Sequence, residues 1–109
     1  QGDFDRIVDQ KHFAKVYRDT HIEKATWGYH DHHSFLEANK IFREIDHQHQ
    51  SFVSVILSTS NHPPHRYPKV FLDSHPHYQN EHVESGSAYS DWSLKLFFEA
   101  AQKEAFYYH

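Results

Sequence analysis

The feature that most constrains this chain is residues 51–68, where an apolar run ends abruptly in a polar turn rich in proline. Residues 52–57 are mostly β-branched or aromatic and lack strict alternation, which is typical of a strand covered on both faces in a parallel sheet. Polar residues follow at once: Ser58, Thr59, Ser60, Asn61 and His62. Because ligands of open α/β sheets collect at the carboxyl ends of strands, the sequence predicts a buried strand that carries a functional loop.

The surrounding patterns predict an α/β fold with helices packed on a partial, mainly parallel sheet. A capping box of Ser34 and Glu37 predicts one helix start, and Ser87 predicts another. Apolar residues recur at helical spacing in both helices: Phe35, Ala38, Ile41, Phe42 and Ile45 in the first, and Tyr89, Trp92, Leu96, Phe97, Ala100 and Ala101 in the second. A covered strand needs neighbouring strands to pair with its backbone N–H and C=O groups, and we find only one strong strand in the chain. We therefore expect the chain to be an interior part of a larger sheet.

The remaining segments give weaker patterns. Residues 2–17 are compatible with a short helix and a loop, and residues 20–27 with connecting structure. Residues 73–86 are polar and predict a long surface excursion, which in a compact domain is either functional or mobile. Residues 106–108 resemble the approach to another strand.

Length and charge exclude several classes of protein. The 109 residues suffice for one small domain, so we treat residues 1–109 as a single segment. A net charge of −4 with scattered Lys and Arg gives no basic stripe, so we expect no nucleic-acid partner. The chain has no cysteine, which excludes disulfides and thiolate metal sites. It begins at Gln1 and has no methionine, so we expect a processed product or a piece of something longer.

Histidine is the compositional oddity, with 13 copies against 11 Lys and Arg. Scattered surface histidines are the simpler interpretation. The alternative is a non-enzymatic, His-rich metal-binding or interaction module that holds zinc or copper. Its candidate ligands are His30, Asp31, His32 and His33, with His47 and His49. A helix between the two groups would separate them by roughly 20 Å, so a single site using both is excluded.

Three blocks resemble, in order, the catalytic domain of lipoteichoic acid synthase-like sulfatases and phosphoglycerol transferases in the alkaline phosphatase superfamily. They are residues 2–6 followed by 27–31, residues 52–68, and residues 88–94 with Phe97 and Phe98. Within the second block, Thr-Ser-Asn-His-Pro-Pro at residues 59–64 is similar to the family's Ser/Thr-Asn-His-x-Pro motif. The resemblance spans nearly the whole chain and implies an internal segment of such a domain.

The resemblance implies a role for His62, which matches the histidine that contacts the phosphate or sulfate ester. A histidine there can donate to an ester oxygen and, when protonated, stabilise developing charge. Asn61 is expected to support the loop through its own backbone, and the planar fork of Arg66 suits an anionic ester. We therefore name His62, Asn61 and Arg66 as substrate-binding candidates.

The resemblance also implies a cofactor and a location. The family holds a divalent cation, manganese or magnesium, but its nucleophilic threonine and Asp-His pair fall outside this chain. We thus expect no catalytic residue, metal ligand or cofactor in the chain alone. The complete protein is expected to carry a membrane segment outside this chain and to act on lipid or glycan head groups at the extracytoplasmic face. Exposed sheet edges would favour association.

Overall fold

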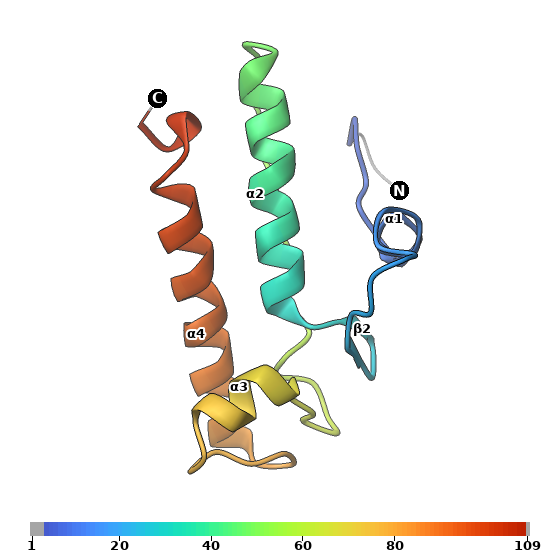
Figure 1. Ribbon diagram of the computed structural model, residues 1–109, viewed down its shortest axis with the longest axis vertical. Helices are drawn as coiled ribbons and strands as arrows, with labels where there is room; N and C mark the ends of the chain where they lie inside the picture. The colour runs from blue at the N-terminus through green and yellow to red at the C-terminus, as the bar shows by residue number, and fades with distance from the viewer. Residues whose placement is uncertain (1–3, 109) are drawn as a thin grey trace.

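The computed structural model describes residues 4–108, so the start of the block at residues 2–6 lies outside the described range. Two long helices, α2 (Asp31–His47) and α4 (Val83–Ala101), lie side by side along the longest axis (Figure 1). The short helix α3 (Lys69–Ser74) packs at one end, and a 3-10 turn, η1 (Ala105–Tyr108), at the other. Within residues 4–108, no helix is both long and apolar enough to cross a membrane.

The predicted apolar stripe of α2 is confirmed, because Phe35, Ala38 and Ile41 are buried. The predicted helix starts are wrong. α2 begins at Asp31, with His30 as its N-cap, so Ser34 lies within the helix. A carboxylate in the first turn is favoured by the helix dipole, which explains the earlier start.

α4 begins before Ser87, at Val83, with His82 as its N-cap. The early start buries Ser85 and Gly86, and the loop before α3 packs there. A Cβ at Gly86 would lie 2.5 Å from Asn61 Oδ1 and 2.8 Å from the Tyr67 hydroxyl. Glycine at this position therefore allows the loop to approach α4 closely.

The aromatic cluster at this end forms the most compact part of the core. Its fully enclosed members are Tyr67, Phe71 and Tyr89, and half-buried side chains surround them: Leu72, Tyr78, Ala88 and Trp92. The apolar stripe predicted for α4 is therefore confirmed at Tyr89 and Ala101, which are buried, and at Trp92, which packs against the cluster. The loop between the helices is shorter than the surface excursion predicted at residues 73–86, because α3 extends to Ser74 and α4 begins at Val83.

The predicted parallel sheet is absent from the described residues. Their only sheet is an antiparallel hairpin of β1 (Lys24–Ala25) and β2 (Gly28–Tyr29), inside and just after the predicted connecting structure. Gly28 has a φ of 143°, which favours glycine. Residues 106–108 form part of η1 instead of approaching a strand.

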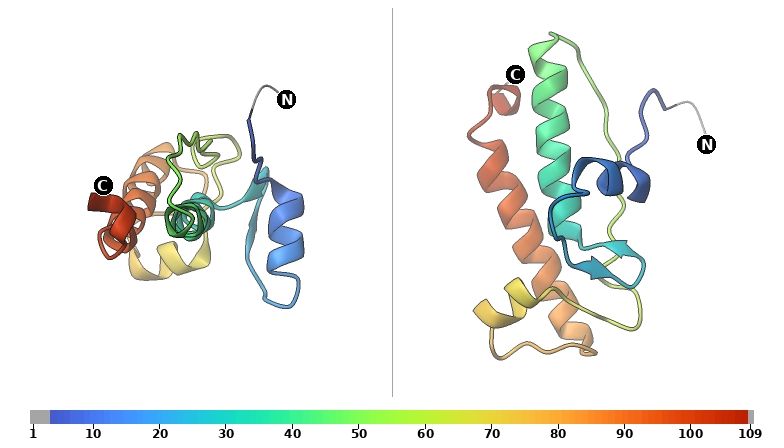
Figure 2. Two further views of the ribbon diagram at one scale, coloured as in Figure 1. Left: turned by 90° about the horizontal axis from the view of Figure 1, so that it is seen from above. Right: turned by 45° about the vertical axis from the view of Figure 1, so that its right-hand side comes forward.

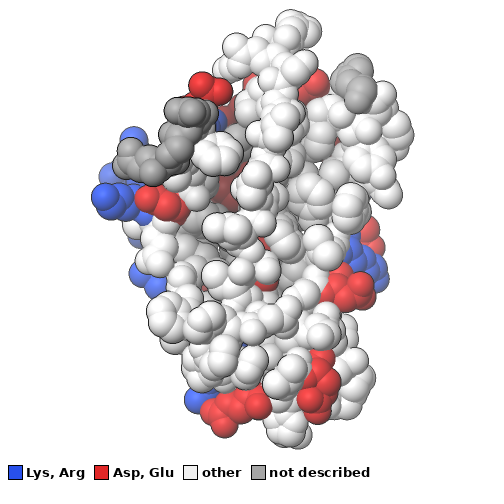
Figure 3. Space-filling view, turned by 180° about the vertical axis from the view of Figure 1, so that it is seen from behind, with Lys and Arg blue, Asp and Glu red and all other residues white. Residues whose placement is uncertain are grey.

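Residues 51–59 descend beside α2 as an extended segment that pairs with no strand in the described part of the chain (Figure 2). Val53 is 92% exposed and Leu57 83%, so the buried strand predicted from this run is not buried here. The face seen from behind is largely uncharged, with charged groups at its margins (Figure 3). A segment forms a β-strand only where its backbone N–H and C=O groups pair with a neighbouring strand. Residues 4–108 provide no such neighbour for this segment.

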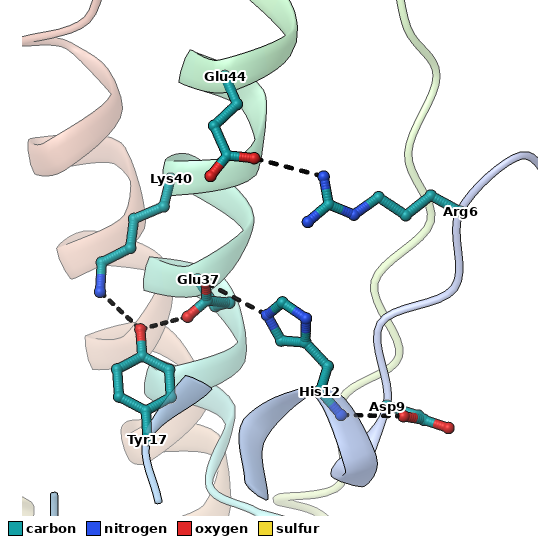
Figure 4. A network of polar contacts seen from close by, with 7 residues as sticks. All are labelled: Arg6, Asp9, His12, Tyr17, Glu37, Lys40 and Glu44. Carbon is teal, nitrogen blue, oxygen red and sulfur yellow. Dashed lines mark hydrogen bonds and ion pairs between the residues drawn. The ribbon is translucent and has the colours of Figure 1, made fainter. Parts of the chain in front are cut away.

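A polar network fixes α1 (Gln10–Val16) to α2 (Figure 4). Glu37, on α2, is 6% exposed and accepts a hydrogen bond from the Tyr17 hydroxyl. Lys40 Nζ donates to the same hydroxyl at 2.6 Å, and His12 Nε2 lies 3.4 Å from Glu37 Oε1. Burial, with the nearby Glu37 carboxylate, raises the pKa of Tyr17, so its hydroxyl stays a donor.

Two further contacts belong to this network. Asp9 caps α1 by accepting from the backbone N–H groups of Lys11 and His12 at 3.0 and 3.3 Å. Arg6 reaches Glu44 of α2 at 3.4 Å across an exposed surface (Figure 4). The helix predicted within residues 2–17 is thus confirmed for residues 10–16, and the buried Phe13, stacked on Tyr29, adds apolar packing to the polar contacts.

Candidate functional site

The candidate site is the loop at the end of the extended segment, and Asp31 fixes its backbone. Asp31, at the start of α2, is 2% exposed. Its Oδ1 accepts from the Thr59 N–H at 2.8 Å, and its Oδ2 accepts from the Ser60 N–H at 3.2 Å and from the Ser60 hydroxyl. Burial raises the pKa of Asp31, and the hydrogen bonds from Thr59 and Ser60 oppose that shift. One carboxylate therefore satisfies two consecutive backbone donors of the loop.

The loop then turns and meets α4. The His62 N–H donates to the Thr59 carbonyl at 3.2 Å, which closes a tight turn. The Asn61 side-chain amide donates to Ser90 Oγ on α4 at 3.3 Å. Asn61 thus supports the loop as expected, but through α4 instead of through its own backbone. The loop is held from both long helices, while the His62 side chain remains exposed.

The His62 ring has one nitrogen occupied. Its Nδ1 lies 2.7 Å from the Pro63 carbonyl oxygen. A carbonyl oxygen only accepts hydrogen bonds, so Nδ1 carries the hydrogen. The Trp27 indole N–H donates to the same carbonyl at 3.0 Å, and the two rings lie 4.7 Å apart between centroids. Nε2 is then the nitrogen of His62 left for a ligand.

An open pocket of about 450 Å³ lies at this loop, and it is lined by Trp27, Ser58, Thr59, Asn61 and His62. Hydroxyl and amide groups can donate to an anionic oxygen, and His62 Nε2 can do so when the ring is protonated. The structure thus brings Asn61 and His62 together at one pocket. It does not bring Arg66 there: Arg66 pairs with Glu81 at 2.8 Å on an exposed surface.

The histidines at the start of α2 belong to the interior. His30 and His32 are 3% and 6% exposed. The backbone N–H of His32 donates to the Tyr89 hydroxyl at 3.1 Å, and that hydroxyl lies 2.6 Å from His32 Nδ1. Burial, with the neighbouring His33 and His30, lowers the pKa of His32 to about 3, so its ring is neutral near pH 7. Burial likewise lowers the pKa of His30 and His33.

These residues do not fit a metal ion. Both oxygens of Asp31 already accept from the loop, and His32 Nδ1 contacts Tyr89. His47 and His49 are exposed at the other end of α2. Across residues 4–108, no three His, Asp or Glu side chains are grouped so that they could hold a metal. The metal-binding alternative thus has no site in the described chain.

Sequence reasoning missed Asp31 and Trp27 as parts of the site. It weighed Asp31 only as a metal ligand and Trp27 only as the end of a segment. The sole indication was their presence in the block at residues 27–31, which the resemblance singled out. Neither contact with the loop follows from local spacing, because the contacts span at least 28 residues along the chain.

Comparison with known proteins agrees with this geometry. A crystal structure of a protein in the alkaline phosphatase superfamily from Vibrio parahaemolyticus is similar to this chain, with a TM-score of 0.78 and 26% sequence identity. The match covers 94% of this chain and 24% of that protein, so the chain spans about a quarter of its length.

Residues 1–107 match the sulfatase family, and the chain belongs to that family. Enzymes of the family are generally metal-dependent and act on sulfate or phosphate esters. The family match and the similar structure agree with the resemblance to the alkaline phosphatase superfamily that was drawn from the sequence.

Proposed function

We propose that this chain is the part of a sulfatase-family enzyme that presents His62 to a phosphate or sulfate ester. The observation that carries the proposal is the combination of an exposed His62 side chain with a backbone held by Asp31 and by α4. A fixed loop suits a site that must place a donor against an ester oxygen, and the free Nε2 of His62 becomes that donor when the ring is protonated. A loop with only a structural role would not require its histidine to face an open pocket.

The proposed contacts divide between four residues of the loop: His62, Asn61, Ser58 and Arg66. His62 Nε2 meets the ester, and when the ring is protonated it donates to an anionic oxygen. Asn61 and Ser58 line the same pocket and offer further donors. Arg66 would have to exchange Glu81 for the ester, and since it already lies in an exposed ion pair, that exchange costs little.

The chemical step belongs to residues outside this chain. The described residues group no three His, Asp or Glu side chains that could hold a metal ion. We propose that the complete enzyme holds manganese or magnesium and that this segment contributes substrate contact only. This division of substrate contact and chemical step between different parts of the enzyme agrees with the coverage, because the chain matches 24% of the similar solved protein.

The subfamily, substrate and location are proposed from the sequence resemblance. The ordered blocks favour the lipoteichoic acid synthase-like group, whose members include phosphoglycerol transferases. On that basis the substrate is a lipid or glycan head group at the cell envelope. The enzyme then works at the extracytoplasmic face and is attached to the membrane by a segment outside this chain.

The exposed extended segment fits the same proposal. Val53, Val55 and Leu57 are apolar, exposed and unpaired in the described chain. We propose that other strands of the same catalytic domain cover them and complete a sheet, because a flat apolar strand left open favours association. Without that cover, the isolated chain would associate through the same edge.

The test is steady-state kinetics of the full reading frame that contains this chain, with Mn²⁺ or Mg²⁺ supplied. The substrates are an aryl sulfate and a glycerophosphoryl ester. His62→Gln should lower kcat/KM by about 10²-fold or more, since it removes a charge-stabilising donor. His47→Gln, an exposed histidine at the far end of α2, is the matched control and should leave kcat/KM unchanged. Equal activity of the two variants toward both esters would refute the proposal.

A further inference from the structure

The chain contains two tryptophans in opposite environments. Trp92 is half-buried against the aromatic cluster of Tyr67, Phe71 and Tyr89. Trp27, in the turn of the β1–β2 hairpin, is 58% exposed and yet makes a specific polar contact with the loop. Burial of a large apolar side chain therefore does not account for Trp27.

We infer that Trp27 is a positioning residue for His62, which holds the imidazole with Nδ1 engaged and Nε2 toward the substrate pocket. This inference rests on the proposed function. Trp27 is not a catalytic residue in this account, because it acts through the ring of His62 and the carbonyl of Pro63.

Trp27 and His62 donate to the same acceptor, the backbone carbonyl of Pro63. The Pro63 oxygen accepts from the Trp27 indole N–H at 3.0 Å and from His62 Nδ1 at 2.7 Å. A carbonyl oxygen has two lone pairs, so both hydrogen bonds can form at once. The indole thereby holds the acceptor that fixes the His62 tautomer. Loss of the indole N–H would leave that carbonyl with a single, exposed partner.

The rings of Trp27 and His62 are also in contact. The Trp27 and His62 centroids lie 4.7 Å apart with an interplanar angle of 60°, close to an edge-on arrangement. Such a contact occupies one side of the imidazole and limits the rotamers open to an exposed histidine. Trp27 and His62 also line the same pocket, so the indole forms its apolar wall.

The place of Trp27 in the hairpin distinguishes a positioning role from packing within the hairpin. The hairpin has only two residue pairs, Lys24 with Tyr29 and Ala25 with Gly28. Trp27 lies in the turn between the two strands, where an exposed side chain adds little to the stability of the hairpin. The Trp27 carbonyl accepts from Gln10 Nε2 at 3.4 Å, whereas the indole N–H is directed at the residue that follows His62.

The experiment combines ring ¹⁵N NMR with kinetics, both of the full reading frame. With the His62 signals assigned by His62→Gln, we expect the tautomer with hydrogen on Nδ1. Trp27→Ala should move the Nδ1 and Nε2 signals toward the other tautomer. Trp27→Phe retains a ring beside His62 but lacks the N–H, and should give an intermediate shift.

In the full reading frame, Trp27→Ala should lower kcat by roughly tenfold or more with KM changed less than about twofold, since misorientation of a contacting group affects the chemical step. Trp27→Phe should recover part of the loss. Phe98→Leu, which alters an exposed aromatic side chain on α4, is the control and should change neither the ring signals nor kcat.

The outcomes separate the two proposals. Full activity of His62→Gln would overturn the proposed function, whatever Trp27 does. A loss in His62→Gln with unchanged kcat and unchanged ring signals in Trp27→Ala would overturn the positioning role alone. Lower melting temperatures in both Trp27 variants, without movement of the His62 ring signals, would show a purely structural residue and would also overturn it.

Discussion

Two buried carboxylates on α2, Asp31 and Glu37, fix different parts of the chain and do so by different means. Asp31 accepts from two backbone N–H groups of the loop that carries His62. Glu37 contacts only side chains, the Tyr17 hydroxyl and the His12 ring. A backbone N–H can only donate, whereas a hydroxyl and a neutral imidazole can each donate or accept.

This difference predicts unequal tolerance to substitution. Partners that can reverse their direction can adapt when a carboxylate becomes an amide. Partners that only donate cannot adapt, and a buried donor left without an acceptor costs about 1–3 kcal/mol. We therefore expect the loop of the candidate site to be far more sensitive to its carboxylate than helix α1 is.

The largest effect is expected for Asp31→Ala. It leaves the Thr59 and Ser60 N–H groups without their acceptors, which should lower the free energy of unfolding by about 2–4 kcal/mol. Asp31→Asn retains one acceptor and should lose about half as much. Urea denaturation measures the stability, and amide exchange at Thr59 and Ser60 measures the loop. Protected amides in Asp31→Ala would contradict the account.

Acidification by one pH unit below 6.5 should have the next largest effect. The folded-state pKa of His32 is about 3, against 6.5 for an ordinary histidine, so the unfolded chain binds more protons between those values. Stability should thus fall as pH drops from 6.5 toward 3, by up to about 1.4 kcal/mol per pH unit. The raised pKa of Asp31 acts in the opposite sense, since its stabilisation is fully present below 3.8 and is lost as pH rises through the folded value.

The measurement is urea denaturation at several pH values with wild type and His32→Gln. The variant should show a weaker pH dependence, because it lacks the titrating ring while retaining a polar side chain beside Tyr89. An equal slope for both proteins would assign the acid sensitivity to other groups.

Gly86→Ala should have a smaller effect, of about 1 kcal/mol, because the added methyl group displaces Asn61 and Tyr67 from α4. It tests the second attachment of the loop while Asp31 remains in place. The Asn61 side-chain amide signals should shift, and the Thr59 and Ser60 amides should stay protected. Unchanged Asn61 signals would mean that the loop is not packed on α4 as described.

The smallest effect is expected for Glu37→Gln, below about 0.5 kcal/mol. The amide oxygen can still accept from Tyr17, and the amide nitrogen can donate to a neutral His12 ring. Tyr17→Phe is the complementary variant, because it removes the hydroxyl that joins Glu37 to Lys40. A loss in Glu37→Gln as large as that in Asp31→Asn would remove the contrast between the two carboxylates.

The sequence predicted local features better than it predicted partners. The stripe of Phe35, Ala38 and Ile41 was correct because helical periodicity is set by residues a few positions apart. The starts of α2 and α4 were wrong because buried contacts with distant loops outweighed the local capping signals at Ser34 and Ser87. Capping propensity is worth only about 1 kcal/mol, so tertiary contacts override it.

The sheet was mispredicted for a related reason. Residues 52–57 have the composition of a covered strand, and they are extended, but composition does not say which segment covers them. The site shows the same limit. The block around Asn61 and His62 was identifiable from its resemblance, whereas Asp31 and Trp27 reach it only through folding.

The most direct test of the central claim is ¹⁵N NMR of the histidine rings in the full reading frame during titration with sulfate and with sn-glycerol 3-phosphate. The account predicts that the Nε2 signal of His62 moves with saturable binding, while the signals of His47 do not. Movement of His62 that is lost in Asp31→Ala would tie ligand contact to the fixed loop. Saturable binding that leaves His62 Nε2 unmoved would contradict the claim.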